Sequence, residues 1–119
     1  MPGPGRCFTA WVAEPQAITV EDDPAGERYV ITVDGKLAGS AYYEADGNRR
    51  TFIHTEVDPE FEGHGLGGRL AAAALADVRA RGLTAVPLCP FISAWLRRHP
   101  DQLDVVEEPY RSQLAARTA

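Results

Sequence analysis

The apolar residues change their spacing once along this chain, and that change limits the folds open to it. Before Val57 they alternate with polar residues, as Tyr29, Ile31 and Val33 do, which is the period of a strand with one buried face. From Leu66 they recur at every fourth residue, which is the period of an amphipathic helix. Strands followed by helix, strand and helix predict one α+β (mixed α/β) domain.

Turn residues divide the first half of the chain into strands. Asp34-Gly35 and Asp46-Gly47 predict two hairpin turns, and hence an antiparallel meander. The expected strands are 17–23 and three strands within 28–57.

The second half begins with the expected helix, which spans 67–81 and is ended by Gly82. Its apolar stripe is Leu66, Leu70, Ala71, Ala74, Leu75 and Val78. Beyond it we expect a fifth strand at 84–89, a short helix that Pro100 stops, and a last strand at 103–108.

Length and composition set the organisation of the chain. Its 119 residues, 45% of them hydrophobic, fit one domain. We expect a flexible arm at 1–15, the domain at 16–108 and a C-terminal tail at 109–119.

The bulk properties exclude several classes of protein. A net charge of −5 argues against nucleic acid as the main partner. Two isolated cysteines and no histidine cluster predict neither a disulfide framework nor a metal site. The first residues lack the apolar stretch of a signal peptide, and no run approaches the ~18 apolar residues of a membrane span. We therefore expect a cytoplasmic protein without a membrane partner.

A glycine-rich turn stands where the long helix begins, although each glycine in a helix costs about 0.5–1 kcal/mol relative to alanine. No Ser, Thr, Asp or Asn between Pro59 and Leu70 can cap this helix. Unpaired N–H groups at the positive end of a helix dipole form an anion site. The pattern equally fits a plain turn whose donors face water. The glycines are Gly63, Gly65, Gly67 and Gly68.

The segments TFIHTEVDPEF (51–61), EGHGLGGRLAAAAL (62–75) and TAVPLCPF (84–91) together resemble the acetyl-coenzyme A site of the GNAT superfamily of N-acetyltransferases. More narrowly, with RHP at 98–100, they resemble its small single-domain YjdJ-type branch. The resemblance covers about residues 28–106. It implies the GNAT-like acyl-CoA N-acyltransferase fold with a splayed sheet, and acetyl-CoA as cosubstrate without a metal.

The resemblance also implies a coenzyme site, in which main-chain N–H groups of the glycine turn hold the pyrophosphate. Glu62 stands where the superfamily has Arg or Gln, and it is left out because a carboxylate cannot donate to phosphate. The predicted coenzyme-binding residues are Thr55, Val57, Gly63, His64, Gly65, Leu66, Gly67, Gly68, Arg69, Cys89 and Phe91.

Three residues are candidates for the chemistry, namely His54, Glu56 and Cys89. Strand alternation puts His54 and Glu56 on one face together with Phe52. Either could take the proton of an acceptor amine, and the alternative is a buried structural pair. For His54 the two roles fit equally, whereas the resemblance favours Glu56 as base or relay, because superfamily members often use a carboxylate near this position. Cys89 has three open roles, since it could line the pantetheine tunnel, protonate the leaving thiolate or take the acetyl group itself.

The sequence therefore predicts an acetyl-CoA-dependent N-acetyltransferase whose amine acceptor is a small molecule or a protein lysine. The alternative is a non-catalytic acyl-CoA-binding or regulatory module, because the helices with which larger superfamily members build an acceptor site have no counterpart here. Many members use a tyrosine acid beyond the fifth strand. No tyrosine lies between Tyr43 and Tyr110, so the acid is not assigned.

Overall fold

The computed structural model describes residues 17–118, so the predicted arm at 1–15 lies outside the described residues. Five strands form one sheet in the order β2-β3-β4-β5-β6. Neighbouring strands are antiparallel except β5 and β6, which are parallel. This confirms the predicted α+β class and the meander. The strands are β2 (Ile18–Asp23), β3 (Arg28–Val33), β4 (Lys36–Asp46), β5 (Arg49–Val57) and β6 (Thr84–Pro87).

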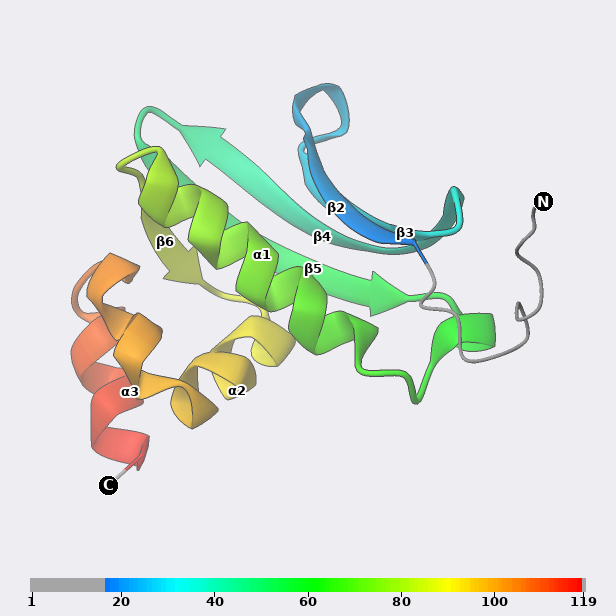
Figure 1. Ribbon diagram of the computed structural model, residues 1–119. Coiled ribbons are helices and arrows are strands. Elements are labelled where there is room, and N and C mark those ends of the chain that lie inside the picture. The colour runs from blue at the N-terminus through cyan, green and yellow to red at the C-terminus, as the bar shows by residue number, and fades with distance from the viewer. Residues whose placement is uncertain (1–16, 119) are drawn as a thin grey trace, which may run out of the picture.

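In the described part of the chain three α-helices accompany the sheet. Helix α1 lies across one face of it while α2 and α3 gather at the β6 end (Figure 1). The predicted apolar stripe of α1 is entirely buried against the strands. Among residues 17–118 no helix packs on the other face, which we call the open face. No described helix is both long and apolar enough to cross a membrane. The helices are α1 (Leu66–Ala80), α2 (Pro90–Arg98) and α3 (Tyr110–Thr118), with short 3-10 turns η1 (Pro24–Gly26), η2 (Pro59–Phe61) and η3 (Pro100–Val105).

A β-bulge interrupts β5. Phe52 pairs with Tyr43 of β4, but the neighbouring β4 residue, Tyr42, pairs with His54. Ile53 is therefore an extra residue in β5 that is not paired with a residue of β4. Such a bulge shifts the alternation of the side chains that follow it.

The bulge decides which side chains of β5 face the helices. Beyond it, Thr55 and Val57 continue the covered face to which Phe52 belongs, because their β4 partners are buried residues of that face. His54 and Glu56 point to the open face, where their side chains are 61% and 57% exposed. The alternation that grouped these two residues with Phe52 is therefore wrong.

The sheet opens between β5 and β6. The two strands pair only from Arg49–Thr84 to Phe52–Pro87, and the N–H groups of Leu88 and Cys89 then both donate to the Phe52 carbonyl. From there β6 turns away into α2 while β5 continues to Val57. The last five residues of β5, 53–57, thus lie along a gap in the sheet, as the predicted splay requires.

The predicted last strand at 103–108 is wrong. Residues up to Val105 form the 3-10 turn η3, and only Val106 makes a single parallel bridge, to Ala85. The apolar side chains that suggested a strand, such as Leu103, are buried from the 3-10 turn instead. The segment predicted as a C-terminal tail contains α3, whose Leu114 is buried in the common core.

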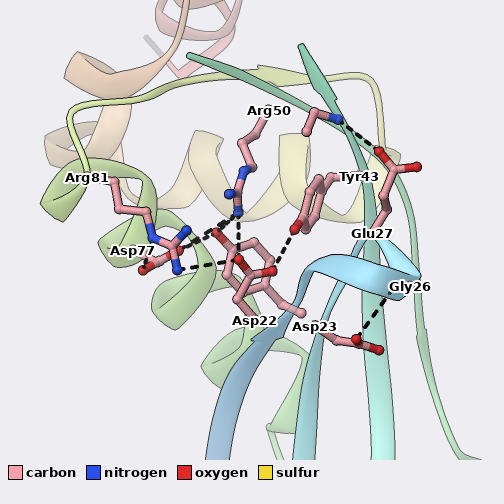
Figure 2. Close-up of polar contacts among 10 residues, drawn as sticks. Asp22, Asp23, Gly26, Glu27, Tyr43, Arg50, Asp77 and Arg81 are labelled. Carbon is pink, nitrogen blue, oxygen red and sulfur yellow. Dashed lines mark hydrogen bonds and ion pairs between the residues drawn. The ribbon is translucent and has the colours of Figure 1, made fainter. Parts of the chain in front are cut away.

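A buried polar cluster fastens the end of α1 to the sheet (Figure 2). Arg50 of β5 donates to Asp22 (3.2 Å) and to the Tyr29 hydroxyl (2.5 Å). That hydroxyl donates to Asp77 of α1 (2.6 Å). Arg81 lies 3.1 Å from Asp77 and 3.4 Å from Asp22. Two guanidinium groups thus balance two carboxylates, so none of these partly or fully buried charges is without a counter-ion.

Candidate functional site

Helix α1 begins without a side-chain cap. Its N-cap is Gly65, which has a φ of +73°, and no side chain accepts a hydrogen bond from the first turn. The first N–H that finds a helical partner is that of Arg69, which donates to the Gly65 carbonyl (3.2 Å). The N–H groups of Leu66, Gly67 and Gly68 have no acceptor within residues 17–118. The predicted uncapped start of the helix is confirmed.

A cavity of about 200 Å³, which we call the glycine-turn cavity, lies beside these N–H groups. It brings together the end of β5, the glycine turn and Phe91 of α2, whose ring lies against α1. Most of the predicted coenzyme-binding residues line it. The lining residues are Val57, Phe61, Glu62, Gly63, Gly65, Leu66, Gly67, Gly68 and Phe91.

The glycines of the turn serve two different purposes. Gly63 and Gly65 have positive φ values, and no atom lies within 4 Å of the Cβ that a larger residue would carry, so the backbone is open to a ligand. A Cβ at Gly67, in contrast, would lie 2.7 Å from the Phe91 ring. Gly67 therefore lets the Phe91 ring of α2 lie directly against α1, a reason that spacing in the sequence did not reveal.

Four predicted coenzyme-binding residues do not line the glycine-turn cavity, namely Thr55, His64, Arg69 and Cys89. His64 and Arg69 are exposed and line a separate cavity of about 310 Å³ beside the ends of β2 and β3. Any contact of these two residues with a ligand in the glycine-turn cavity would have to come from their main chain or from a change of rotamer.

Cys89 lies where β5 and β6 separate. Its side chain is buried, at 2% exposure, and its sulfur shares a hydrogen bond with the Thr55 hydroxyl across the gap (3.3 Å). Its N–H is held by the Phe52 carbonyl (2.9 Å). The structure therefore brings together two predicted residues from distant segments on the covered side of β5.

His54 and Glu56 form a group on the open face. His54 Nε2 lies 3.6 Å from Glu56 Oε1, and the Tyr42 hydroxyl donates to Glu56 Oε2 (3.2 Å). The Tyr42 ring stacks on the imidazole, with 6.2 Å between the centroids. Because His54 and Glu56 are exposed, the alternative of a buried structural pair is wrong. The sequence did not indicate Tyr42, which joins the group only through the pairing of β4 with β5.

A third cavity, also of about 310 Å³, opens beside Glu56 on this side of the sheet, and we call it the open-face cavity. Glu56 and Asp58 supply carboxylates to it, and Tyr42 and Ser40 supply hydroxyls. The lining residues are Arg28, Leu37, Ala38, Gly39, Ser40, Tyr42, Glu56, Val57, Asp58 and Pro59.

The glycine-turn cavity and the open-face cavity lie on either side of the end of β5. Thr55 points toward Cys89, and the next residue, Glu56, points into the open-face cavity. Beyond Phe52, β6 does not pair with β5, so this edge of residues 53–57 has no neighbouring strand. Such a site can hold two reactants on opposite sides of one strand. In the described part of the chain, no three His, Cys, Asp or Glu side chains are grouped as metal ligands would be.

Comparison with known proteins agrees with this architecture. The family model described as GCN5-related N-acetyl-transferase matches residues 28–105, which run from β3 to the end of η3. The NMR solution structure of a GCN5-like protein from Staphylococcus aureus is similar, with a TM-score of 0.58 and 22% identity over 75% of this chain and 87% of that chain. At this identity the similarity shows the fold alone. No curated protein matches the sequence.

Proposed function

Because the chain belongs to the GCN5-related N-acetyltransferase family, we propose that it transfers the acetyl group of acetyl-CoA to an amine. The observation that carries this proposal is the uncapped start of α1, which lies beside the gap between β5 and β6. From the segments quoted above we also propose that the chain belongs to the YjdJ-type branch of the superfamily.

The pyrophosphate of the coenzyme is proposed to bind the N–H groups of Leu66, Gly67 and Gly68. These donors have no acceptor in the described chain, and they stand at the positive end of a 15-residue helix. Gly63 and Gly65 leave the space beside them free of side chains. The main chain supplies these contacts, so the carboxylate of Glu62 has no part in them.

The pantetheine arm is proposed to run along β5 from Val57 toward Thr55. This edge of the strand faces the gap, where β6 offers no partner for its main-chain groups. The arm would end at the contact between Thr55 and Cys89, which lies on the covered side of the strand. Phe91 and Val57 supply apolar walls near the start of this path.

Transfer requires a neutral amine. An alkylamine with a pKa of about 10.4 is about 3.4 units from its neutral form at pH 7, which costs roughly 4.6 kcal/mol. A base must therefore accept a proton, and Glu56 and His54 are titratable side chains of the part of β5 that borders the gap. We propose Glu56 for this role, because Tyr42 holds one carboxylate oxygen and its other oxygen faces His54.

Cys89 is proposed to lie beside the thioester sulfur. Its burial and its contact with Thr55 are compatible with each of the three roles considered above, namely wall, acid for the leaving thiolate and acetyl carrier. We propose that the acetyl group passes directly from the coenzyme to the amine, with Cys89 beside the coenzyme and not as the acetyl carrier. A mass spectrum taken under rapid quench without an acceptor decides whether an acetyl-cysteine forms.

Calorimetry and a release assay for coenzyme A test the function together. We expect acetyl-CoA to bind with one site per chain, and an amine panel to release free coenzyme A faster than water does. Binding without release on any amine would support the acyl-CoA-binding module instead. A melting temperature that millimolar acetyl-CoA leaves unshifted would contradict both functions.

A further inference from the structure

We infer that the open-face cavity binds the alkylammonium group of the acceptor, as found in a lysine side chain or a small diamine. The inference rests on the proposed function only for the identity of this amine as the acetyl acceptor. Its basis is the chemistry of the cavity lining, which mixes carboxylates and hydroxyls with a guanidinium that is already paired.

The charges in the cavity favour a cation. Arg28 lies 3.1 Å from Asp23, a carboxylate outside the cavity lining that balances its charge, and it also donates to Ser40 within the lining. Within residues 17–118, the side-chain partners of Glu56 are His54 and the Tyr42 hydroxyl. No Lys or Arg side chain of the described residues forms an ion pair with Glu56 or Asp58. Two carboxylates therefore face the cavity without a fixed cation.

The groups around the carboxylates fit an ammonium rather than a metal ion. One side-chain oxygen of Asp58 accepts a hydrogen bond from the Glu60 N–H (2.9 Å), and one of Glu56 accepts from the Tyr42 hydroxyl (3.2 Å). Neither carboxylate is therefore free to chelate a metal ion with both oxygens. One oxygen of each remains to accept from N–H donors. The aromatic ring of Tyr42 forms a further wall, against which an alkylammonium group packs well.

The size and place of the cavity also fit this group. A volume of about 310 Å³ is at the lower end of ligand cavities and is enough for one alkylamine chain. The cavity borders Glu56, whose neighbour Thr55 contacts Cys89 through the gap in the sheet. An amine held there would lie on the opposite side of β5 from the proposed thioester.

Binding of the amine can be tested without relying on transfer. We suggest titrating the ¹⁵N-labelled chain with 1,4-diaminobutane, with a lysine peptide blocked at both ends, and with uncharged 1,4-butanediol. We expect saturable shifts of the amide signals of Ser40, Tyr42 and Glu56 with the two amines and none with the diol. The two amines separate a small-molecule acceptor from a protein lysine.

Charge-removing variants locate the site. Glu56→Gln and Asp58→Asn should each raise the Kd of the amine about fivefold, the effect of one charge at about 4 Å in a water-like dielectric. Asparagine at 58 still accepts the Glu60 N–H, so the turn is kept. Glu21→Gln is the matched control, because Glu21 is an exposed carboxylate in the same cross-strand row, reached from Glu56 through Ser40 and Val30. Its Kd should stay within about twofold of wild type.

The outcomes separate this inference from the proposed function. A further cavity lies between α2 and α3, where Leu88, Arg97 and Tyr110 are among its lining residues. Shifts that map to that cavity, or a Glu21→Gln variant that loses as much affinity as Glu56→Gln, would overturn the site. Amine binding at the open-face cavity without release of coenzyme A would leave the site standing and contradict the transferase. Release of coenzyme A together with amine-induced amide shifts outside the open-face cavity would support the transferase and contradict the site.

Discussion

Replacing Gly65 by alanine should weaken coenzyme binding far more than it weakens the fold. Gly65 has a φ of +73°, a conformation that costs an L-residue about 1–2 kcal/mol. No atom lies within 4 Å of the added Cβ, so steric overlap adds nothing to this cost. At about 4 °C per kcal/mol for a domain of this size, the melting temperature should fall by about 4–8 °C.

In the complex the same Cβ would stand beside the N–H groups that we propose for the pyrophosphate. We expect the Kd of coenzyme A to rise at least about tenfold, or about 1.4 kcal/mol. At about 100 times the wild-type Kd, coenzyme A should stabilise wild type by about 2.7 kcal/mol and the variant by only about 1.4 kcal/mol. Thermal shift measurements with and without ligand, together with calorimetry, give both quantities.

Gly82→Ala supplies the matched control. Gly82 follows the other end of α1, has a φ of +70° and likewise has open space around its Cβ position. It should lose the same stability as Gly65→Ala and bind coenzyme A as wild type does. Equal Kd values for Gly65→Ala and Gly82→Ala would show that the pyrophosphate does not lie at the glycine turn.

Three further predictions concern the thiol and the buried cluster. Cys89→Ala should keep turnover within about tenfold of wild type if the thiol is only a wall, and should lower it about 10²–10⁴-fold if the thiol is the acid, as a coenzyme-release assay would measure. Arg50→Met should lower the free energy of unfolding by about 3 kcal/mol, because Arg50 is 11% exposed and central to the cluster, whereas Arg49→Met, at 46% exposure, should cost less than about 1 kcal/mol in the same urea titration. Burial first, and then the hydrogen bond to a carboxylate, raises the pKa of Tyr43 to about 12 and raises that of Tyr29 further. Both tyrosines contribute stability that is complete below their unfolded pKa of about 10 and is lost as the pH rises through the folded pKa values. The free energy of unfolding, measured from pH 9 to 12, should therefore decline steadily. A free energy that stays constant over this range would contradict the burial.

Local patterns in the sequence were enough for the antiparallel meander, for α1 and for the uncapped start of that helix. The alternation around Tyr29 and the Asp-Gly pairs specify hairpins because turn chemistry and strand period act over a few residues. The stripe from Leu66 to Val78 specifies a helix with one buried side for the same reason. The absence of a capping residue is also a local property, so the free N–H groups at Gly67 could be predicted.

The segment 103–108 shows where a local pattern is ambiguous. Its apolar residues fit a strand or a 3-10 turn equally well, and the partner decides between them. β6 has four residues, and its free edge offers this segment only the bridge between Ala85 and Val106. The rest of the segment buries Leu103 without strand pairing.

The arrangement of the candidate site was decided by tertiary structure. The bulge at Ile53 arises from the register between β4 and β5, and it moved His54 and Glu56 to the open face, whereas nothing in the residues of β5 alone marks it. The same register brought Tyr42 to Glu56, and the crossover through α1 brought Cys89 to Thr55. Period and capping are encoded within one turn or one strand, but contacts between strands depend on how distant segments align, and that alignment is fixed only when the whole core packs.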